Sequence, residues 1–421
     1  MYLFYFFAAV LVFLGYKSLR GGIDYLRFFR SELAAPVSGF SPPASVIAPC
    51  RGLDQDLREN LAALFRQNYP RYEIIFVVDE VGDEAAEVIG ELIGKQNERE
   101  AERRPGKGFL KTPDIFPSVA ARLVVAGKAR GEGQKVHNLR RAVGEVRSDS
   151  EVLVFVDSDA RPGPDWLRSL VAPLEDGETG CATGYRWFVP ERGGFASHLR
   201  AVWNASIASA LGSNERKNFC WGGSTAIRTD LFAELEMAEK WRGTLSDDFA
   251  LTRALHSAGR PIRFVPGCLT ASVEDCTFGE LLEFTNRQMK ITRVYAPHLW
   301  KASLIGSLIF TGTFWAGVAL LFFISGPAFW ITGALLLIVL ALGVGKAHLR
   351  LKAVKMILRD HQKELNRSFP WQISLWVLTP ALYFFNCFSA LLSNEILWRG
   401  IRYKLESPEE TVVMNDDPVK N

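Results

Sequence analysis

Hydrophobic positions form long runs at the two ends of the chain and short periodic runs in its middle. The run Tyr2–Tyr16 contains no charged residue, and Lys17 and Arg20 follow it. It is shorter than the roughly 20 residues of a typical membrane span, and it lacks the basic start and the cleavage site of a secretory signal. The pattern favours an uncleaved anchor over residues 1–20 with its C-terminal side in the cytoplasm; a buried core helix is the alternative. Residues 21–40 are expected to form a juxtamembrane linker.

Three apolar stretches near the other end are long enough, or nearly so, to cross a membrane. They are Ala302–Ile324, Ala328–Val344 and Trp371–Leu392. Ser325-Gly326-Pro327 predicts a tight hairpin between the first two, and the basic residues of 346–370 predict a cytoplasmic loop. Pro380 can break the third stretch into a re-entrant or interfacial element; an unbroken span would place the tail outside. Residues 299–421 are therefore expected to form a membrane region.

Between these ends, residues 41–298 alternate short apolar runs with amphipathic segments. The strands are expected at Ala44–Pro49, Tyr72–Val78, Arg122–Ala126 and Val152–Val156. The helices are expected at Leu53–Asn68, Glu84–Gln96, Gln134–Val146 and from Gly163 onward. Such alternation predicts right-handed β-α-β units and an α/β domain with a mainly parallel sheet flanked by helices.

Composition changes this picture little. A net charge of +3 gives no reason to expect a nucleic-acid partner. The six cysteines show no C-x-x-C spacing and the six histidines do not cluster with them. A zinc site is therefore not expected, and the cysteines are interpreted as reduced, mostly buried thiols.

The most informative segment is the apolar run Val152–Val156, which ends in Asp157-Ser158-Asp159. Open α/β sheets bind their ligands at the carboxyl ends of parallel strands. Two carboxylates one residue apart suit a hard divalent cation, which often shares its ligands with a diphosphate. The pattern predicts a nucleotide-diphosphate site, and a pair of acids that only caps a turn is the alternative.

Several further motifs occur in a characteristic order along the chain. They are Pro49-Cys50-Arg51-Gly52, the phrase from Gln67 to Glu73, Asp79, Lys135 with Asn138, Asp157-Ser158-Asp159, Asp247-Asp248, the phrase from Arg287 to Ile291, and the phrase from Trp398 to Tyr403. With these motifs the chain resembles the family 2 glycosyltransferases, and within them the ceramide glucosyltransferase-like group, which includes bacterial hopanoid-pathway relatives. The resemblance extends from the first anchor almost to the C-terminus. It implies a GT-A-like fold with N- and C-terminal transmembrane helices.

One departure from the family pattern concerns the segment before the C-terminal membrane region. The family has Gln or Arg, two further residues, and then Arg-Trp. Arg287 matches the first position, but Lys290 and Ile291 replace the Arg-Trp pair. Lysine keeps the charge without the bidentate fork, and the lost tryptophan removes a stacking face, so the departure bears on the acceptor more than on the chemistry.

The donor side is expected to use acidic residues. Asp159 is predicted to bind Mg²⁺ or Mn²⁺, with Asp157 beside it facing the ribose or the metal. By resemblance, Asp79 and the loop that contains Pro49 and Arg51 contact the uracil or the ribose; Asp79 as an ordinary strand-end residue is the alternative.

Three cations complete the predicted donor side. Lys135 begins a helix, where the dipole disfavours a cation, so an anionic partner such as a phosphate is expected; a solvated lysine is the alternative. Arg287 and Lys290 share one helix face. They are expected to face either the diphosphate or lipid head groups.

The acceptor side is expected around Asp247 and Asp248. Ser246 has the character of an N-cap, which places both acids in the first turn of a helix. The helix dipole alone favours acids there. The functional hypothesis is that Asp248 is the general base for the acceptor hydroxyl, and that Asp247 raises its proton affinity by repulsion.

By resemblance, the loop with Trp221, Gly222 and Gly223 lines the acceptor side. Two glycines allow a ligand to approach the backbone closely, and the tryptophan offers a stacking face for a sugar. A core tryptophan in a simple turn is the alternative.

The resemblance thus implies a membrane-bound, inverting, metal-dependent glycosyltransferase. It would transfer a hexose from a UDP-sugar to the hydroxyl of a ceramide- or hopanoid-like lipid in the bilayer. The alternatives are a processive polysaccharide synthase, which has more spans and the Arg-Trp pair, and a non-catalytic membrane scaffold. The interpretation requires Asp79, Asp159 and Asp248 to lie in one site.

Overall fold

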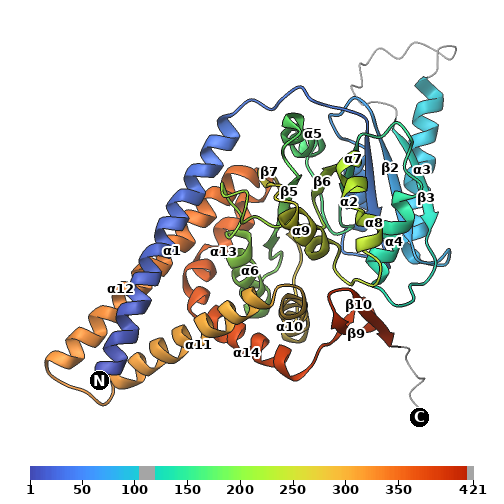
Figure 1. The fold of residues 1–421 in the computed structure, drawn as a ribbon. Coiled ribbons are helices and arrows are strands. Elements are labelled where there is room, and N and C mark those ends of the chain that lie inside the picture. Colours follow the sequence, from blue (N-terminus) through green and yellow to red (C-terminus); the bar gives the residue numbers. More distant parts are fainter. Residues whose placement is uncertain (104–118, 415–421) are drawn as a thin grey trace. The chain divides into compact units, whose positions relative to one another are not determined.

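The computed structural model describes residues 1–103 and 119–414, and the chain folds into two compact units (Figure 1). The helical unit consists of Met1–Ala34, Trp187–Gly212 and Val273–Ile396. The sheet unit consists of Ala35–Arg186, Ser213–Ser272 and the segment from Leu397 onward. This division differs from the predicted boundaries at 41–298 and 299–421, because both units are assembled from separate parts of the chain.

A seven-stranded sheet in the order β3-β2-β1-β4-β6-β5-β7 forms the centre of the α/β fold. The strands are β1 (Ala44–Pro49), β2 (Tyr72–Val78), β3 (Ala120–Val125), β4 (Val152–Phe155), β5 (Cys181–Val189), β6 (Thr225–Arg228) and β7 (Ile262–Val273). The neighbours β3, β2, β1 and β4 run parallel, whereas β6 is antiparallel to both β4 and β5. The predicted fold class, a mainly parallel sheet flanked by helices, is confirmed.

Apolar runs place these strands in the interior. Every residue of β2 and of β4 is buried, as expected for parallel strands that are covered on both faces. Ile47 of β1 lies opposite Ile75 on one side and Phe155 on the other. All three belong to one core cluster with Val136 and Leu139 of the helix that follows β3.

Short helices cover the sheet. They are α2 (Leu57–Leu64), α3 (Glu84–Arg103), α4 (Gln134–Val143), α5 (Trp166–Val171) with the 3₁₀ turn Ala172–Asp176, α7 (Thr229–Glu234), α8 (Met237–Lys240) and α9 (Asp247–Ser257). The helix predicted from Leu53 begins only at Leu57, because Asp56 has a left-handed backbone conformation with φ of 55°. The predicted helices therefore exist, but most are shorter than expected.

A three-stranded sheet that the sequence pattern did not predict follows the C-terminal apolar helices. It has the order β10-β9-β8, with β8 (Glu395–Trp398), β9 (Ile401–Ser407) and β10 (Glu410–Met414). Arg399 and Gly400 form the two-residue turn between β8 and β9, with φ of 49° and 76°. Positive φ at both positions is typical of hairpin turns whose twist matches the strands, but a left-handed non-glycine residue costs about 1–3 kcal/mol.

The helical unit contains the remaining helices. They are α1 (Tyr2–Ala34), α6 (Phe195–Ala208), α10 (Phe278–Tyr295), α11 (Pro297–Leu320), α12 (Pro327–Ile357), the 3₁₀ turn Arg359–His361, α13 (Gln362–Ser374), the 3₁₀ turn Leu375–Val377 and α14 (Thr379–Leu392). Among the described residues, α1, α11 and α12 are each long and apolar enough to span a membrane. In Figure 1, α1 and α12 run side by side.

Three membrane-region expectations can be compared with these helices. The predicted linker is helical as far as Ala34, because α1 continues beyond its apolar part. In this extension Asp24 and Arg27, three residues apart, form an ion pair. The predicted basic loop 346–370 is also mostly helical, formed by the end of α12 and the start of α13. The third apolar stretch is bent by 60° at the break before Thr379, next to the proline that predicted such a break.

Candidate functional site

The acidic pair predicted at the end of β4 is held by two cations within the sheet unit. Arg186 of β5 places Nη1 2.8 Å from Asp159 Oδ2 and Nη2 3.2 Å from Asp157 Oδ2. Lys135 Nζ lies 2.7 Å from Asp157 Oδ1. Burial alone would raise the pKa of Asp157, but Lys135 and Arg186 hold it below its usual value. Asp157 is therefore a carboxylate at neutral pH.

Asp159 fits a divalent cation. Its Oδ1 is buried and has no hydrogen-bond partner among the described residues, which is costly for a carboxylate oxygen unless a ligand satisfies it. The described residues contain no group of three or more His, Cys, Asp or Glu side chains that could hold a metal by themselves. Asp159, with Asp157 beside it, would thus supply one or two ligands. A diphosphate and water would supply the others, as is common for Mg²⁺.

Lys135 lies in the first turn of α4 and links the two acidic groups. Besides Asp157, its Nζ contacts Asp247 Oδ1 at 3.2 Å, and only 16% of its side chain is exposed. Burial lowers the pKa of Lys135, but Asp157, Asp247 and Asp248 together raise it above its ordinary value. The solvated alternative for this lysine is therefore wrong, and its charge is permanent.

Gly222 makes room for this ion pair. A Cβ atom on Gly222 would lie 2.3 Å from Asp247 Oδ2 and 2.6 Å from Lys135 Nζ. A Cβ on Gly223 would collide with the ring of Trp221, at 2.2 Å. Both glycines of the predicted loop are thus required by the packing of the site itself.

Trp221 is buried beneath Arg186. The guanidinium carbon lies 4.9 Å from the centroid of the indole ring, and Tyr185 packs against the same ring at 5.5 Å. Only 7% of Trp221 is exposed. Stacking of this ring on a sugar stays a prediction, and its observed contact is with the cation that binds the acidic pair.

Asp247 and Asp248 begin α9 as predicted, and Ser246 is the N-cap that accepts a hydrogen bond from Phe249 N. Asp247 is buried, and burial with repulsion from Asp248 raises its pKa to about 6 even though Lys135 lowers it. Asp248 is half-buried, and its Oδ1 contacts Ser246 Oγ and accepts from Phe249 N at 2.8 Å. The structure thus shows a raised pKa at Asp247, the neighbour of the predicted base.

Asp79 lies at the end of β2, where the loop after β1 covers it. Its Oδ2 accepts from Arg51 Nη1 at 2.8 Å, while its buried Oδ1 has no partner among the described residues. Burial raises the pKa of Asp79, and Arg51 opposes this effect. Pro49 ends β1 and lies beside this loop. A hydrogen-bond donor such as an N–H group of a base or a ribose hydroxyl would satisfy the remaining oxygen.

Sequence reasoning missed three residues that connect these groups. Arg399, in the β8–β9 turn, contacts Asp54 Oδ1 at 2.7 Å and donates to the carbonyl oxygen of Arg51 at 2.8 Å. Asp54 in turn accepts from Ser158, between the two acids of the pair. Arg186 is the third missed residue. The only sequence signal for Arg399 was its place in the Trp398–Tyr403 motif, which gave no position in space.

Contacts therefore link the predicted residues of the sheet unit into one site. Asp79 reaches Arg51, whose carbonyl oxygen binds Arg399; Arg399 interacts electrostatically with Asp159. Lys135 contacts both Asp157 and Asp247, and it also interacts electrostatically with Asp248. The predicted residues at the sheet edge lie in one region of the sheet unit.

Arg287 and Lys290 belong to the helical unit. Lys290 Nζ donates to the carbonyl oxygen of Glu395 at 2.7 Å, and burial lowers the pKa of this lysine. Arg287 lies 4.0 Å from Glu283 and over the ring of Phe284. The roles predicted for these two cations stay predictions.

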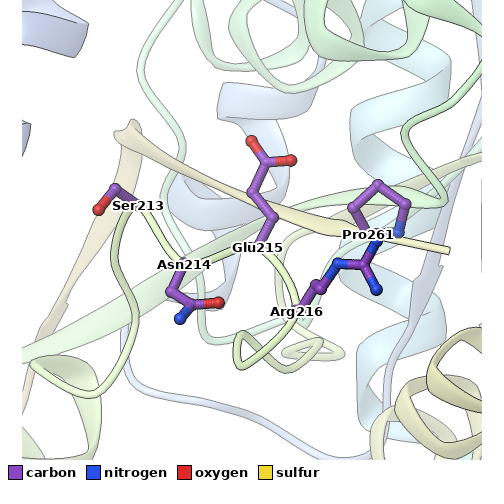
Figure 2. Close-up of a pocket in the computed structure, with 5 residues that line it drawn as sticks. All are labelled: Ser213, Asn214, Glu215, Arg216 and Pro261. Carbon is purple, nitrogen blue, oxygen red and sulfur yellow. The ribbon is translucent and has the colours of Figure 1, made fainter. Parts of the chain in front are cut away.

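A separate hollow in the sheet unit contains none of the predicted site residues (Figure 2). Its lining residues are Ser213, Asn214, Glu215, Arg216 and Pro261. Glu215 pairs with Arg263 at 3.1 Å, and its carbonyl oxygen accepts from Ile262 N. These contacts join the segment to β7 and give the hollow a structural explanation.

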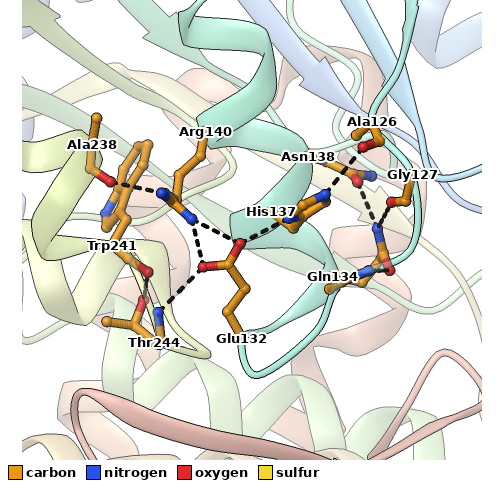
Figure 3. A network of polar contacts seen from close by, with 12 residues as sticks. Ala126, Gly127, Glu132, Gln134, His137, Asn138, Arg140, Ala238, Trp241 and Thr244 are labelled. Atoms are coloured by element: carbon orange, nitrogen blue, oxygen red, sulfur yellow. Dashed lines mark hydrogen bonds and ion pairs between the residues drawn. The ribbon is translucent and has the colours of Figure 1, made fainter.

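Glu132 fixes the position of α4 (Figure 3). Its buried carboxylate binds His137 Nδ1 at 2.8 Å, Arg140 Nη1 at 2.7 Å and Gly243 N at 3.2 Å. Gly133 N donates to Thr244 O at 2.8 Å. Burial raises the pKa of Glu132, but His137 and Arg140 bring it below its usual value. This network holds the start of α4, with Lys135, against the segment that leads into α9.

Comparisons with known proteins give the following likenesses. The chain is 23% identical over 261 residues to "Ceramide glucosyltransferase 1" of Caenorhabditis elegans, which covers 61% of this chain and 51% of that protein. It is 29% identical over 135 residues to the ceramide glucosyltransferase of Candida albicans, which covers 31% of this chain and 22% of that protein. The chain thus spans about half, or less, of the length of these curated relatives.

Among solved structures, one similar chain is a mannosyltransferase from Pyrobaculum calidifontis in complex with GDP-Man and Mn²⁺. The TM-score is 0.44 at 18% identity, with 92% of this chain and 98% of that chain covered. Another is the glucosyl-3-phosphoglycerate synthase from Mycobacterium tuberculosis, with a TM-score of 0.36 at 15% identity, covering 63% and 81% of the two chains.

The model of glycosyl transferase family 21 matches residues 6–102 and 112–411, which is most of the chain. The expected ceramide glucosyltransferase-like resemblance is thereby confirmed, whereas the hopanoid part stays a prediction. The match includes both the sheet-edge residues and the β8–β9 turn. On this evidence the chain belongs to glycosyl transferase family 21.

Proposed function

We propose that this protein is a membrane-bound glycosyltransferase that moves a hexose from a UDP-sugar to the hydroxyl group of a membrane lipid. The observation that carries the proposal is the acidic pair at the end of β4, where Asp159 keeps a buried oxygen without a partner beside the permanent cations Lys135 and Arg186. Such a set of charges suits a diphosphate that binds together with a divalent cation. Family membership and the names of the relatives support a glycosyl donor and a ceramide-like lipid acceptor.

In the proposed donor complex, each group has a separate task. Mg²⁺ or Mn²⁺ at Asp159 would neutralise charge on the leaving diphosphate. Lys135 and Arg186, which bind Asp157 and Asp159 in this structure, would bind phosphate oxygens of the donor. They could do so because the bound metal ion would take over part of the negative charge of the two aspartates. Asp79 and the Arg51 loop would receive the uridine, with the buried Oδ1 of Asp79 as the acceptor for its N–H or O–H group.

Asp248 is the proposed general base. It is half-buried at the start of α9, next to Asp247 and within the electrostatic reach of Lys135. It would take the proton of the acceptor hydroxyl as that oxygen attacks the sugar carbon. Inversion of configuration is an expectation from the family resemblance.

The membrane placement is part of the proposal. A lipid acceptor stays in the bilayer, and α1, α11 and α12 are long and apolar enough to hold this protein in the same bilayer. We infer that the sheet unit faces the cytoplasm, since Lys17 and Arg20 follow the first apolar run and basic residues follow the α11–α12 hairpin.

The test is an assay of membranes that contain the full-length protein with labelled UDP-sugars and Mn²⁺, with the labelled lipid identified by mass spectrometry. The Asp248→Asn variant should lose about 10²–10⁴-fold in rate. Glu239→Gln, which changes an exposed acid of a surface ion pair, is the matched control and should keep the rate. Unchanged transfer by Asp248→Asn would refute the base assignment. A wild-type protein that neither binds UDP nor transfers sugar to any lipid extract would favour the scaffold alternative, and a labelled polymer would favour the synthase.

A further inference from the structure

The β8–β9 turn places an arginine in a backbone conformation that disfavours it. Arg399 has φ of 49°, a position where glycine or asparagine is ordinarily found in two-residue hairpins. Residues held in such conformations persist only where surrounding contacts fix them, and they cluster at functional sites. Gly400, the other turn residue, adopts its positive φ without this penalty.

The contacts of Arg399 lead to the acidic pair. The guanidinium binds Asp54 through Nη2 and the carbonyl oxygen of Arg51 through Nη1. Asp54 accepts from Ser158, which lies between Asp157 and Asp159. Arg399 therefore lies between the loop after β1, whose Arg51 binds Asp79, and the turn that contains the acidic pair.

The charge of Arg399 also acts on this turn. Asp54, Asp159 and Asp157 together raise the pKa of Arg399, against the effect of burial. Among the described residues, the guanidinium makes the two hydrogen-bonded contacts given above, whereas arginine carries five N–H donors in a planar fork. About a third of its side chain is exposed, at 35%. Donors thus remain that a ligand at the acidic pair can use.

We propose that Arg399 binds the diphosphate of the nucleotide sugar, so that the C-terminal hairpin completes the donor site. The inference rests on the proposed function for the identity of the donor. Arginine suits this task because its fork can bind two phosphate oxygens at once. Asp54 holds the fork in place, and the Arg51 carbonyl oxygen ties it to the loop that receives the uridine.

Other anchors of the hairpin fit the same placement. Tyr403 Oη accepts from Gln134 N, at the start of α4 beside Lys135. A Cβ atom on Gly243 would lie 2.2 Å from Glu409 O, which shows how closely the β9–β10 turn packs against the segment before α9. The hairpin is thus fixed to the start of α4 and to the segment before α9 without help from Arg399, so a variant at this position can keep the fold.

The experiment compares the Kd values of UDP and uridine for the purified full-length protein with Mn²⁺. The main variant is Arg399→Gly, because glycine adopts the turn conformation freely and the hairpin keeps its other anchors. Arg399→Lys tests the fork, and Lys404→Ala is the control, since Lys404 pairs with Glu406 on the same hairpin. We expect Arg399→Gly to weaken UDP at least tenfold and uridine less than twofold, Arg399→Lys to be intermediate, and Lys404→Ala to match the wild type.

Two results would overturn the proposal. Unchanged UDP affinity in Arg399→Gly would show that the arginine does not touch the diphosphate. An equal loss for UDP and uridine would show that it only supports the Arg51 loop. A wild-type protein that binds neither ligand would instead refute the nucleotide-sugar donor, and the role of Arg399 with it.

Discussion

At the scale of single residues, Gly222 determines whether Lys135 and Asp247 can meet. The space that a side chain would occupy is filled by these two charged groups. Gly222→Ala should displace the ion pair and reduce transferase activity about 10²-fold, because small displacements of bound groups have effects of that size. Gly163→Ala is the matched control, since a Cβ atom there meets no other atom within 4 Å. Equal activity of the two variants in the lipid-labelling assay would contradict the role of this ion pair.

The same scale shows what the sequence could and could not predict. The pair after β4 and the acids after Ser246 were predictable, because a buried strand end and an N-cap are local patterns. The ion pairs of Arg186 were not, because β5 enters the sheet beyond the antiparallel β6, and sequence spacing gives no sign of that order. The unpartnered oxygen of Asp159 likewise depends on which neighbours fold around it.

At the scale of elements, the hydrogen bonds and ion pairs of Glu132 hold the start of α4 against the segment that leads into α9. Glu132→Gln removes the charge that His137 and Arg140 share, and we expect it to destabilise the fold by about 2–3 kcal/mol. Thermal unfolding in detergent would measure the loss. Glu239→Gln, whose partner Arg242 is exposed, should leave the midpoint unchanged. A midpoint for Glu132→Gln equal to that of this control would show that other contacts hold α4.

Element boundaries followed from the sequence where apolar periodicity was strong. The central strands and α9 lie close to their predicted positions, because burial on both faces or an N-cap defines them. The hairpin of β8, β9 and β10 was missed, since its strands are short and its turn contains an arginine instead of the usual asparagine or glycine pair. The sequence did not predict that residues 21–34 and 346–357 are helical. These segments are rich in charged residues, and such a composition is also typical of loops.

At the scale of the whole molecule, the segments of the sheet unit limit how often the chain can cross the membrane. Ala35–Arg186 and the segment from Leu397 onward belong to one compact unit, so the chain between them would cross a membrane an even number of times. If α11 and α12 both span, the bent pair α13–α14 does not cross. On this condition the segment after Leu397 would lie on the same side of the membrane as the rest of the sheet unit.

Cysteine labelling from outside and inside sealed vesicles tests this topology. Val81→Cys in the sheet unit and Glu409→Cys in the hairpin are highly exposed positions and should label from the same side. Tyr2→Cys and Phe323→Cys, at the far ends of α1 and of the α11–α12 hairpin, should label from the opposite side. Labelling of Glu409→Cys together with Phe323→Cys would show that the bent pair crosses after all.

The late position of the β8–β9 turn in the chain has a consequence for biosynthesis. A ribosome translates every apolar helix described here before it reaches Arg399 and Tyr403. The loop after β1 and the start of α4 therefore gain these contacts only after those helices have been made. Nascent or truncated polypeptides would lack these contacts. If α1, α11 and α12 insert as they are synthesised, the final assembly of the sheet unit would follow membrane insertion.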